Sequence, residues 1–320
     1  MRRVVLAAVT LCLVLAIAST SFAAVAQLVM ATGGTAGTYY PLGGAMAQLI
    51  SEKVKGVNIT VQSTGASIAN LRMIHSREVD LALVQTDTAD YAWNGTEFFE
   101  KDGKMRSFGV VASLYPELIQ IVASADSGIN SVADLKGKRV SVGAPGSGTE
   151  ANARQILEAY GLSYKDLAQV QYLSFAESAE AFKDKHIDAF FVTAGIPNAG
   201  IQDVATQHKI KIVEVPDDMY KKLHDKYGFY GQAVIPAGTY INQTKDAKTV
   251  AVQAMLIVRS DLDAGLVYEM TRALFENLPE LAMAHAKGKE ISLAGALAGV
   301  STPLHPGTEK YFKEKGIIKK

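Results

Sequence analysis

The chain has 320 residues, of which 48% are hydrophobic and 20% are charged, a composition ordinary for a globular protein with a substantial core. At ~150 residues per domain this length allows about two domains, and the composition excludes a disordered acidic tail, a disulfide-stapled miniprotein and a polytopic membrane protein. The 32 Lys and Arg residues balance the 32 Asp and Glu residues, so the chain lacks the basic excess expected of a nucleic-acid binder.

The first residues have the pattern of a secretory signal peptide. Arg2 and Arg3 form a basic start, an apolar run follows, and small residues lead to Ala26. We therefore expect residues 1–26 to be a leader that is removed after Ala23 or Ala26, and the mature protein to reside in the periplasm. An uncleaved membrane anchor is the alternative, but a span needs ~20 strongly apolar residues and this run turns polar after about 14.

The only cysteine of the chain, Cys12, lies within this expected leader. The mature chain would therefore contain no disulfide, no thiol nucleophile and no thiolate metal site. The six histidines form no H-E-x-x-H motif and no other close pair, so we expect no zinc site either.

Beyond the leader, short apolar runs typical of strands alternate with helix-type segments through the first two thirds of the chain. Such alternation predicts an α/β fold with parallel sheets flanked by helices. The expected strands are residues 28–31, 57–62, 79–84, 108–113, 119–123, 139–142, 170–173, 189–192 and 211–215, and the expected helices are residues 40–53, 67–75, 149–160, 177–183 and 198–206.

The last third of the chain has a different pattern. Apolar runs at residues 233–235 and 249–258 precede helix-type segments at residues 266–278, 290–297 and 308–314. A strand, a glycine-rich turn and a helix start occur near residue 30 and again near residue 143. This coarse similarity predicts two α/β lobes that open in the same way.

Four of the expected strand-to-helix turns are rich in Gly, Ser and Thr and contain no charged residue. In a parallel α/β sheet such turns lie at the carboxyl ends of strands, where ligands bind. Each offers main-chain N–H groups at a helix start, which attract anions, although any one turn alone is explained by helix capping. Together they predict a cleft between two lobes that holds a small anion, most simply a carboxylate. The turns are residues 33–38, 63–67, 145–149 and 193–198.

A few larger side chains lie beside these turns. Gln85 ends the third expected strand, so we expect it to face the cleft. Asp87 is expected to cap the following helix, because a bare carboxylate would repel an anion. Tyr39 follows the first turn and either contacts a ligand or packs in the core, and Tyr115 lies at the expected passage between the lobes.

Arginine would be the obvious charged partner for a carboxylate. Arg154, however, lies between Glu150 and Glu158 at i, i+4, i+8 spacing, which predicts an exposed ladder of ion pairs, and Arg72 is expected to face solvent. A helix terminus contributes ~0.3–1 kcal/mol when exposed and up to ~2 kcal/mol when partly buried. Micromolar binding needs about 8 kcal/mol, so direct hydrogen bonds and lobe closure must supply the rest.

Sequence motifs of common enzymes are missing. The sequence has neither the G-x-x-x-x-G-K-[ST] nucleotide loop nor the G-x-G-x-x-G fingerprint. Ser147 lacks the surrounding G-x-S-x-G motif that presents a nucleophilic serine. With no acid, base or imidazole in the glycine-rich turns, we expect a protein that is not an enzyme and needs no cofactor.

Eight short stretches, in order and spread over essentially the whole mature chain, carry a family pattern. They are GGTAGTYYPLG from Gly33, TGASIANL from Thr64, VQTD from Val84, SLYPE from Ser113, KGKRVSVGAPGSGT from Lys136, FVTAGIPN from Phe191, IPAGTY from Ile235 and PLHPG from Pro303. Their combination resembles the TAXI family, the solute-receptor subunits of TRAP transporters, whereas any single stretch is a weak signal.

The resemblance implies a type II periplasmic binding protein fold with a ligand cleft between two α/β lobes. It also implies that a small organic anion, glutamate or a related dicarboxylate such as 2-oxoglutarate, is captured and delivered to a TRAP membrane permease for uptake driven by an ion gradient. Thr86 departs from the serine common in the family. The residues matching the family's ligand loops are Gly37, Thr38, Tyr39, Thr64, Gly65, Ala66, Ser67, Gln85, Tyr115, Ser147, Gly148, Thr149, Thr193, Ala194 and Gly195.

We expect lobe I to comprise residues 27–114 and 229–320, and lobe II to comprise residues 115–228, with passages between them at residues 113–117 and 227–234. The protein is expected to be a monomer that binds the ligand and the permease and no nucleic acid. Two alternatives stay open: a binding protein of an ABC-type permease or of a sensor, and a small-acid enzyme on the same fold. In the enzyme, mutation of a titratable cleft residue would abolish turnover and leave binding.

Overall fold

The computed structural model describes residues 25–319, and ten strands in this range form one mixed sheet. They are β1 (Ala26–Ala31), β2 (Val57–Gln62), β3 (Leu81–Gln85), β4 (Phe108–Ser124), β5 (Arg139–Ser141), β6 (Gln169–Gln171), β7 (Ala189–Ala194), β8 (Ile210–Val213), β9 (Gly231–Ile235) and β10 (Ala247–Arg259). The strand order is β2-β1-β3-β10-β4-β7-β5-β6, while β8 pairs with β4 and β9 pairs with β10.

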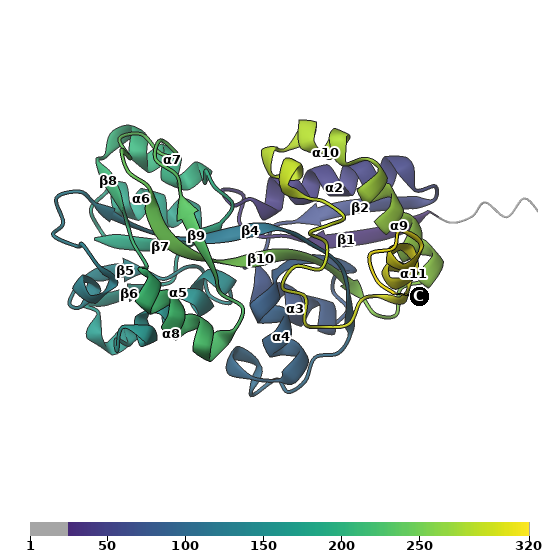
Figure 1. Cartoon of the computed structure of the whole chain (residues 1–320), viewed down its shortest axis with the longest axis horizontal. Helices are drawn as coiled ribbons and strands as arrows, with labels where there is room; N and C mark the ends of the chain where they lie inside the picture. Colours follow the sequence, from purple (N-terminus) through teal and green to yellow (C-terminus); the bar gives the residue numbers. More distant parts are fainter. Residues whose placement is uncertain (1–24, 320) are drawn as a thin grey trace, which may run out of the picture.

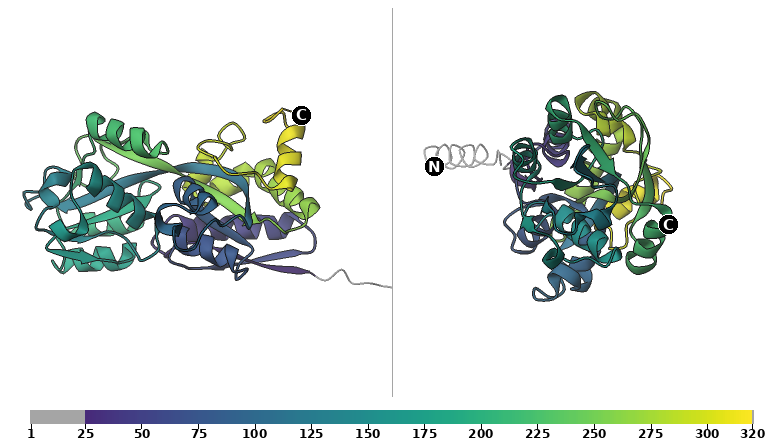
Figure 2. Two further views of the ribbon diagram at one scale, coloured as in Figure 1. Left: turned by 90° about the horizontal axis from the view of Figure 1, so that it is seen from below. Right: turned by 90° about the vertical axis from the view of Figure 1, so that its left-hand side faces the viewer.

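Helices cover both faces of this sheet (Figures 1 and 2). None of those between residues 25 and 319 has both the length and the apolar character that a membrane crossing requires. The α-helices are α2 (Tyr39–Lys53), α3 (Ser67–His75), α4 (Thr86–Asn94), α5 (Gly148–Ala159), α6 (Phe175–Lys183), α7 (Ala199–Gln207), α8 (Asp217–Tyr227), α9 (Ala264–Glu276), α10 (Leu278–Ala284) and α11 (Pro306–Glu314), and the 3-10 turns are η1 (Glu97–Phe99), η2 (Val132–Leu135), η3 (Tyr164–Asp166) and η4 (Ala286–Glu290).

Strand β3 shows why an uninterrupted apolar run becomes a central strand in the first half of the molecule. It pairs in parallel with β1 and antiparallel with β10, and all of its residues are buried. Side chains of a strand alternate between the two faces of the sheet. Leu81 and Leu83 therefore enter the core formed with α2 and α9, while Ala82 and Val84 enter the core formed with α3. Such two-sided burial requires helices on both faces.

Strand β7 has the same role in the second half, where it pairs in parallel with β5 and antiparallel with β4. Phe190 packs in the core that includes residues of α6 and α7, and its neighbour Phe191 packs in the core that includes residues of α5. The two halves thus repeat one arrangement of a sheet between helical layers, and they lie side by side in Figure 1.

Two long antiparallel strands, β4 and β10, run through both halves (Figure 1). Residues 108–113 of β4 pair with the end of β10 that adjoins β3, and residues 118–123 pair with β7. The sequence predicted two separate strands here, and the structure joins them across Pro116. Proline has no N–H to donate, and the register of β10 shifts beside it, between Gln253 and Met255.

The last third of the chain differs from its prediction at one expected helix. Residues 290–297 do not form an α-helix, since η4 ends at Glu290 and turns follow. Contacts with the rest of the protein replace those that a helix would make in this segment. The Ala296 carbonyl accepts a 2.9 Å hydrogen bond from the Ser113 amide, and the Ile291 side chain is buried. In contrast, α8 was not predicted, because only Leu223 and Tyr227 of this polar helix are buried.

The predicted leader, residues 1–26, lies outside the described residues except for its last two positions. The two-lobe α/β architecture corresponds to the prediction. The lobe boundaries themselves stay a prediction.

Candidate functional site

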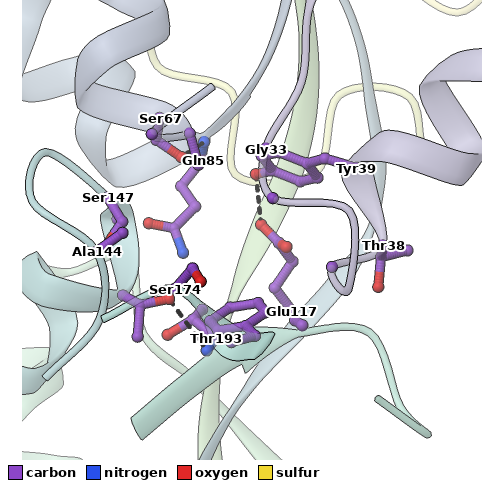
Figure 3. Close-up of a pocket in the computed structure, with 18 of the residues that line it drawn as sticks. Gly33, Thr38, Tyr39, Ser67, Gln85, Glu117, Ala144, Ser147, Ser174 and Thr193 are labelled. Atoms are coloured by element: carbon purple, nitrogen blue, oxygen red, sulfur yellow. Dashed lines mark hydrogen bonds between the residues drawn. The ribbon is translucent and has the colours of Figure 1, made fainter. Parts of the chain in front are cut away.

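Four loops from both halves of the molecule surround one cavity of about 70 Å³ (Figure 3). Each loop follows a strand and leads toward a helix, which is why small residues with hydroxyl groups line most of the wall. Thirteen of the fifteen predicted site residues line this cavity; that they bind a ligand stays a prediction. They are Gly37, Thr38, Tyr39, Thr64, Gly65, Ala66, Ser67, Gln85, Ser147, Gly148, Thr149, Thr193 and Ala194.

Two predicted site residues do not line the cavity. Tyr115 packs in the core of the first half with residues of α2, and its side chain is 1% exposed. Gly195 adjoins the stem of Lys287 instead, because a Cβ atom built on this glycine would lie 2.6 Å from Lys287 Cε.

The cavity also contains residues that the prediction missed. Ser174 and Phe175 line it from the start of α6, and Glu117 lines it from β4. Two sequence signals could have indicated them. Ser174 and Glu177 form a capping box, and Glu117 is the one charged residue in a mostly apolar strand of 17 residues. Gly33, Gly34 and Ala144 complete the wall.

Glu117 is the only carboxyl group among the described residues that line this cavity. Its side chain is 2% exposed, and the Tyr39 hydroxyl donates a 2.6 Å hydrogen bond to its Oε2 atom (Figure 3). Burial raises the pKa of Glu117 to about 8, and this outweighs the bond from Tyr39, which lowers the pKa. At neutral pH the carboxyl group is therefore mostly protonated.

Four helices start at this wall: α2, α3, α5 and α6. Ser147 Oγ accepts a 3.1 Å bond from the Glu150 amide, and Ser174 Oγ accepts a 3.3 Å bond from the Glu177 amide. These caps fix the first turns of α5 and α6 and leave earlier N–H groups for other partners. Helix N-termini carry partial positive charge, so their convergence favours an anionic ligand.

Two hydroxyl groups of the cavity wall, one from each half, accept a hydrogen bond from a main-chain amide. Ser67 Oγ accepts a 3.1 Å bond from the Gln85 amide, and Thr149 Oγ1 accepts a 3.2 Å bond from the Thr193 amide. Each hydroxyl keeps its own hydrogen. Both side chains line the cavity, so each can donate to a ligand oxygen without losing the bond that orients it.

Gln85 reaches across the cavity from the end of β3. Its Nε2 donates a 3.1 Å bond to Asn152 Oδ1, and its Oε1 is buried without a hydrogen-bond partner among residues 25–319. A Cβ atom built on Gly148 would lie 1.6 Å from that Oε1. Position 148 therefore has room only for glycine while Gln85 keeps this conformation.

A buried polar network lies beside the cavity and centres on Asn152 of α5. Its Nδ2 donates to Asp87 Oδ2 at 2.9 Å and to the Tyr230 hydroxyl at 3.0 Å. Its Oδ1 accepts from Gln85 Nε2 and from Thr193 Oγ1 at 3.0 Å. Burial raises the pKa of Asp87 to about 6, although its bonds from the Thr88 amide and from Asn152 lower it. The network thus links α4 of the first half with α5 of the second.

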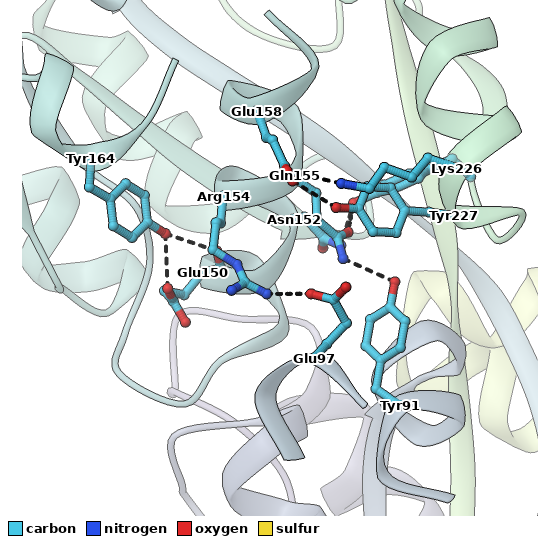
Figure 4. A network of polar contacts seen from close by, with 11 residues as sticks. Tyr91, Glu97, Glu150, Asn152, Arg154, Gln155, Glu158, Tyr164, Lys226 and Tyr227 are labelled. Carbon is cyan, nitrogen blue, oxygen red and sulfur yellow. Dashed lines mark hydrogen bonds and ion pairs between the residues drawn. The ribbon is translucent and has the colours of Figure 1, made fainter. Parts of the chain in front are cut away.

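The predicted ion-pair ladder along α5 is wrong. Arg154 pairs across the two halves with Glu97, at 2.6 Å, and lies over the Phe98 ring at 4.0 Å (Figure 4). Glu150 accepts a bond from Tyr164, and Glu158 accepts bonds from Lys226 and Tyr227 instead. The spacing of residues along one helix predicts only partners on that helix, whereas the contact between the halves gives Arg154 a partner from the other half. Arg154 does not line the cavity, and Arg72 pairs with Asp102 on the surface.

Within residues 25–319, no group of three or more His, Cys, Asp and Glu side chains is arranged to hold a metal ion.

Comparison with known proteins gives a family and a fold. The model of the NMT1-like family matches residues 30–316. PhnD1 from Prochlorococcus marinus (MIT 9301), in complex with methylphosphonate, is similar in structure with a TM-score of 0.58 at 11% identity, over 91% of this chain and 99% of that chain. The alkanesulfonate-binding protein SsuA from Xanthomonas axonopodis pv. citri, bound to MOPS, has a TM-score of 0.51 at 16% identity, over 92% and 95%.

A third solved structure, a putative L-cystine ABC transporter from Listeria monocytogenes, has a TM-score of 0.51 at 17% identity, over 83% of this chain and 98% of that chain. At such identities the likeness shows the fold alone. It confirms the predicted fold class, that of two-lobe periplasmic binding proteins.

These matches correct the resemblance to TAXI receptors of TRAP transporters. The matching family is the NMT1-like family, and the three similar structures are two binding proteins and one protein described as an ABC transporter. A physical reason is at hand, because the stretches that carried the resemblance are largely turns of the cavity. Small residues are needed in these turns because loops of the two halves pack closely together. A Cβ atom on Gly65, for example, would lie 3.1 Å from the Pro145 carbonyl oxygen in the other half.

Proposed function

Because the chain belongs to the NMT1-like family and has the two-lobe fold of periplasmic binding proteins, we propose that it is a solute-binding protein that captures a small ligand for an ABC-type permease. The single observation that carries this proposal is the cavity, whose wall comes from both halves of the molecule. The permease partner is proposed from the Listeria structure, whose description names an ABC transporter. We further propose that the mature protein is a periplasmic monomer and not an enzyme.

The proposed ligand is a small organic anion, such as a carboxylate. Helix starts and hydroxyl groups on the wall support this choice, because they offer hydrogen-bond donors and partial positive charge. Two structurally similar proteins are described with anionic ligands, methylphosphonate and MOPS. About 10–15 Å³ of cavity volume is needed to hold one water molecule. The cavity volume of about 70 Å³ therefore corresponds to only a few water molecules, which favours a compact ligand.

Closure of two lobes is the proposed mechanism of capture. In the present arrangement the Ile68 and Ala69 amides each donate 3.1 Å bonds to the Gly146 carbonyl, and Asn198 Nδ2 donates a 3.2 Å bond to the Ala36 carbonyl. These bonds join loops of opposite halves around the cavity. An open state would lose them and admit the ligand, and ligand contacts from both halves would then favour the closed state.

We also propose where the lobes meet. β4 provides one passage, near the predicted residues 113–117. For the second passage the prediction named residues 227–234, but β9 pairs with the part of β10 that lies next to residues of the second half. We therefore propose that the second passage lies within β10, near Ala251–Ala254.

A ligand screen tests the proposed function. The mature protein is heated with single candidate ligands: amino acids, dicarboxylates, short sulfonates and short phosphonates. At least one anion is expected to raise the melting temperature, and calorimetric titration then gives its affinity. Thr149→Val should weaken that affinity about five- to tenfold, because one hydrogen bond to a charged group is lost. The control Thr206→Val changes an exposed hydroxyl that does not line the cavity. If no candidate shifts the melting temperature, the proposed function is wrong.

A further inference from the structure

Glu117 is the one group in the cavity whose presence the proposed function leaves unexplained. An ionised carboxylate would repel the small anion that the rest of the wall favours. Yet Glu117 lines the cavity and is almost fully buried, and it is held by the Tyr39 hydroxyl through Oε2. Figure 3 shows the carboxyl group, with its bond from Tyr39, between the loops of the two halves.

The charges around Glu117 do not supply a partner for an ionised form. Tyr39 is held neutral, since burial raises its pKa well above the ordinary value. Asp87 of α4 is a second acid and disfavours ionisation. Lys287 of η4 lowers the pKa of Glu117, but by less than burial raises it, and its ammonium group pairs with Glu290 at 2.5 Å. Tyr115 of β4 is also buried and neutral.

No lysine or arginine of the described residues lines the cavity. A buried carboxylate without a cation is costly, and the group keeps its proton instead. The neutral acid has one O–H donor, while Oε2 accepts from Tyr39. The remaining hydrogen-bonding capacity of the group is therefore directed at the cavity.

We propose that Glu117 is a specificity-determining residue that stays protonated and donates its O–H to an anionic oxygen of the ligand, so that the site selects an anion over an ammonium group at this position. This inference rests on the proposed function and adds the chemistry of one contact. Bonds from a neutral acid to an anionic oxygen are short and charge-assisted. An ammonium group at the same position would meet the helix starts that line the cavity, and their partial positive charge would oppose it.

The proposal predicts how the affinity for the ligand changes with pH. A ligand that accepts a bond from protonated Glu117 binds without releasing that proton, and its affinity falls once the free protein loses the proton. With a pKa of about 8, the affinity should be nearly constant below pH 7 and fall about tenfold between pH 7 and pH 9. A ligand whose ammonium group pairs with ionised Glu117 would instead release a proton on binding at pH 7.

Matched pairs of probes test this difference. Pyruvate is compared with L-alanine and 2-oxoglutarate with L-glutamate, because each pair differs in an oxo or an ammonium group. Calorimetry at pH 7 in buffers with different ionisation enthalpies counts the protons exchanged. We expect an oxo acid to bind at least tenfold more tightly than its amino acid, without proton release. Glu117→Gln keeps an N–H donor, so it should retain the affinity within about threefold and remove the loss at pH 9.

The opposite results separate the two proposals. If an amino acid binds more tightly, releases a proton and loses its affinity in Glu117→Gln, this inference is overturned and the proposed function stands. If neither these probes nor the wider screen binds, both are overturned.

A measurement without any ligand checks the protonation itself. The folded pKa of Glu117 lies above its ordinary value of 4.5. The stability of the wild type relative to Glu117→Gln should therefore fall as the pH rises from about 4.5 to about 8, and level off above. A pH-independent difference between the two proteins would show that folding does not raise the pKa of Glu117, and would also overturn the inference.

Discussion

The Asn152 network and the cavity are neighbours between the two halves, and they share Gln85 and Thr193. They differ in how their polar groups are satisfied. Asn152 makes bonds with both of its polar atoms, to four different side chains. In the cavity, Gln85 Oε1 is buried without a hydrogen-bond partner among residues 25–319, and the Glu117 carboxyl group accepts a bond from Tyr39 through Oε2. An unpaired buried group costs about 1–3 kcal/mol.

This difference indicates that the Asn152 network and the cavity have different roles at the contact between the halves. The satisfied network holds α4 and α5 together and gains nothing from an additional partner. The unsatisfied Gln85 Oε1 next to it gains a bond only when a molecule enters the cavity. Mutations in the network should therefore act mainly on the stability of the protein, and mutations in the cavity wall mainly on the affinity for a ligand.

The largest expected effect is that of Asn152→Ala. Four side chains lose a partner, and the buried Asp87 carboxyl group is among them. We expect the free energy of unfolding to fall by about 3 kcal/mol or more, as measured by denaturant titration. Asn94→Ala is the matched control, since Asn94 is exposed and bonds only to Asp90. A loss below 1 kcal/mol for Asn152→Ala would mean that water replaces the network without cost.

A pH series sharpens the same comparison. The pKa of Asp87 is raised from 3.8 to about 6, so its protonated form is favoured in the folded state. The stability that this contributes is complete below pH 3.8 and is lost as the pH rises to about 6. It amounts to at most about 3 kcal/mol at 1.36 kcal/mol per pKa unit. Asp87→Asn should remove this decline.

Denaturant titrations between pH 3.5 and pH 7 measure this effect. Asp134→Asn provides a control of opposite sign, because backbone bonds from Asn130 and Ser131 lower the pKa of Asp134. Its contribution to stability is lost as the pH falls. If the wild type and Asp87→Asn have parallel pH profiles, the pKa of Asp87 is not raised in the folded protein.

Gly148→Ala tests the contact between the two regions. The new Cβ atom would collide with Gln85 Oε1, so the Gln85 side chain would have to leave its bond to Asn152. We expect a stability loss of about 1–3 kcal/mol and an affinity loss of at least tenfold for the ligand found by the screen. Gly44→Ala is the control, since nothing lies within 4 Å of its Cβ position on α2, and it should stabilise the protein slightly.

An affinity unchanged in Gly148→Ala would show that Gln85 moves away easily. The cavity wall at Gln85 would then adapt to a larger neighbour without weakening the binding of the ligand.

Local sequence patterns were sufficient to predict most of the cavity. Strand, small-residue turn and helix start follow each other within about ten residues, so their order in the chain indicates their geometry. The turns that contain Gly37, Ser67, Ser147 and Thr193 all reach one cavity for this reason. The family resemblance, by contrast, was wrong about the transporter class, because residues required by the fold do not distinguish one class of receptor from another.

The groups that join the halves could not be predicted in the same way. Asn152 bonds to Asp87 and Tyr230, which are 65 and 78 residues away, and no periodicity connects such positions. Glu117 was visible as an acid in an apolar strand, but only the crossing of β4 between the halves places it in the cavity. The ladder assigned to Arg154 failed because Glu97, 57 residues away, is the closer partner in space.

The smallest expected effect is that of Arg154→Ala. Its ion pair with Glu97 is partly exposed, with side-chain exposures of 42% and 31%. Such pairs are worth about 0–1 kcal/mol, and the contact with Phe98 adds about 0.5–1 kcal/mol. We expect a stability loss near 1 kcal/mol and an affinity loss below tenfold. Arg72→Ala removes a comparable pair, with Asp102, inside the first half, and should leave the affinity unchanged.

Calorimetric titration of both variants at low and high salt compares a pair that joins the halves with one that does not. The small effect of Arg154→Ala on affinity should disappear at high salt, because screening weakens the exposed pair in the wild type as well. A loss beyond tenfold with an intact fold would mean that charge across the halves controls closure. The uncharged donors of the cavity would then be too weak to hold an anion by themselves.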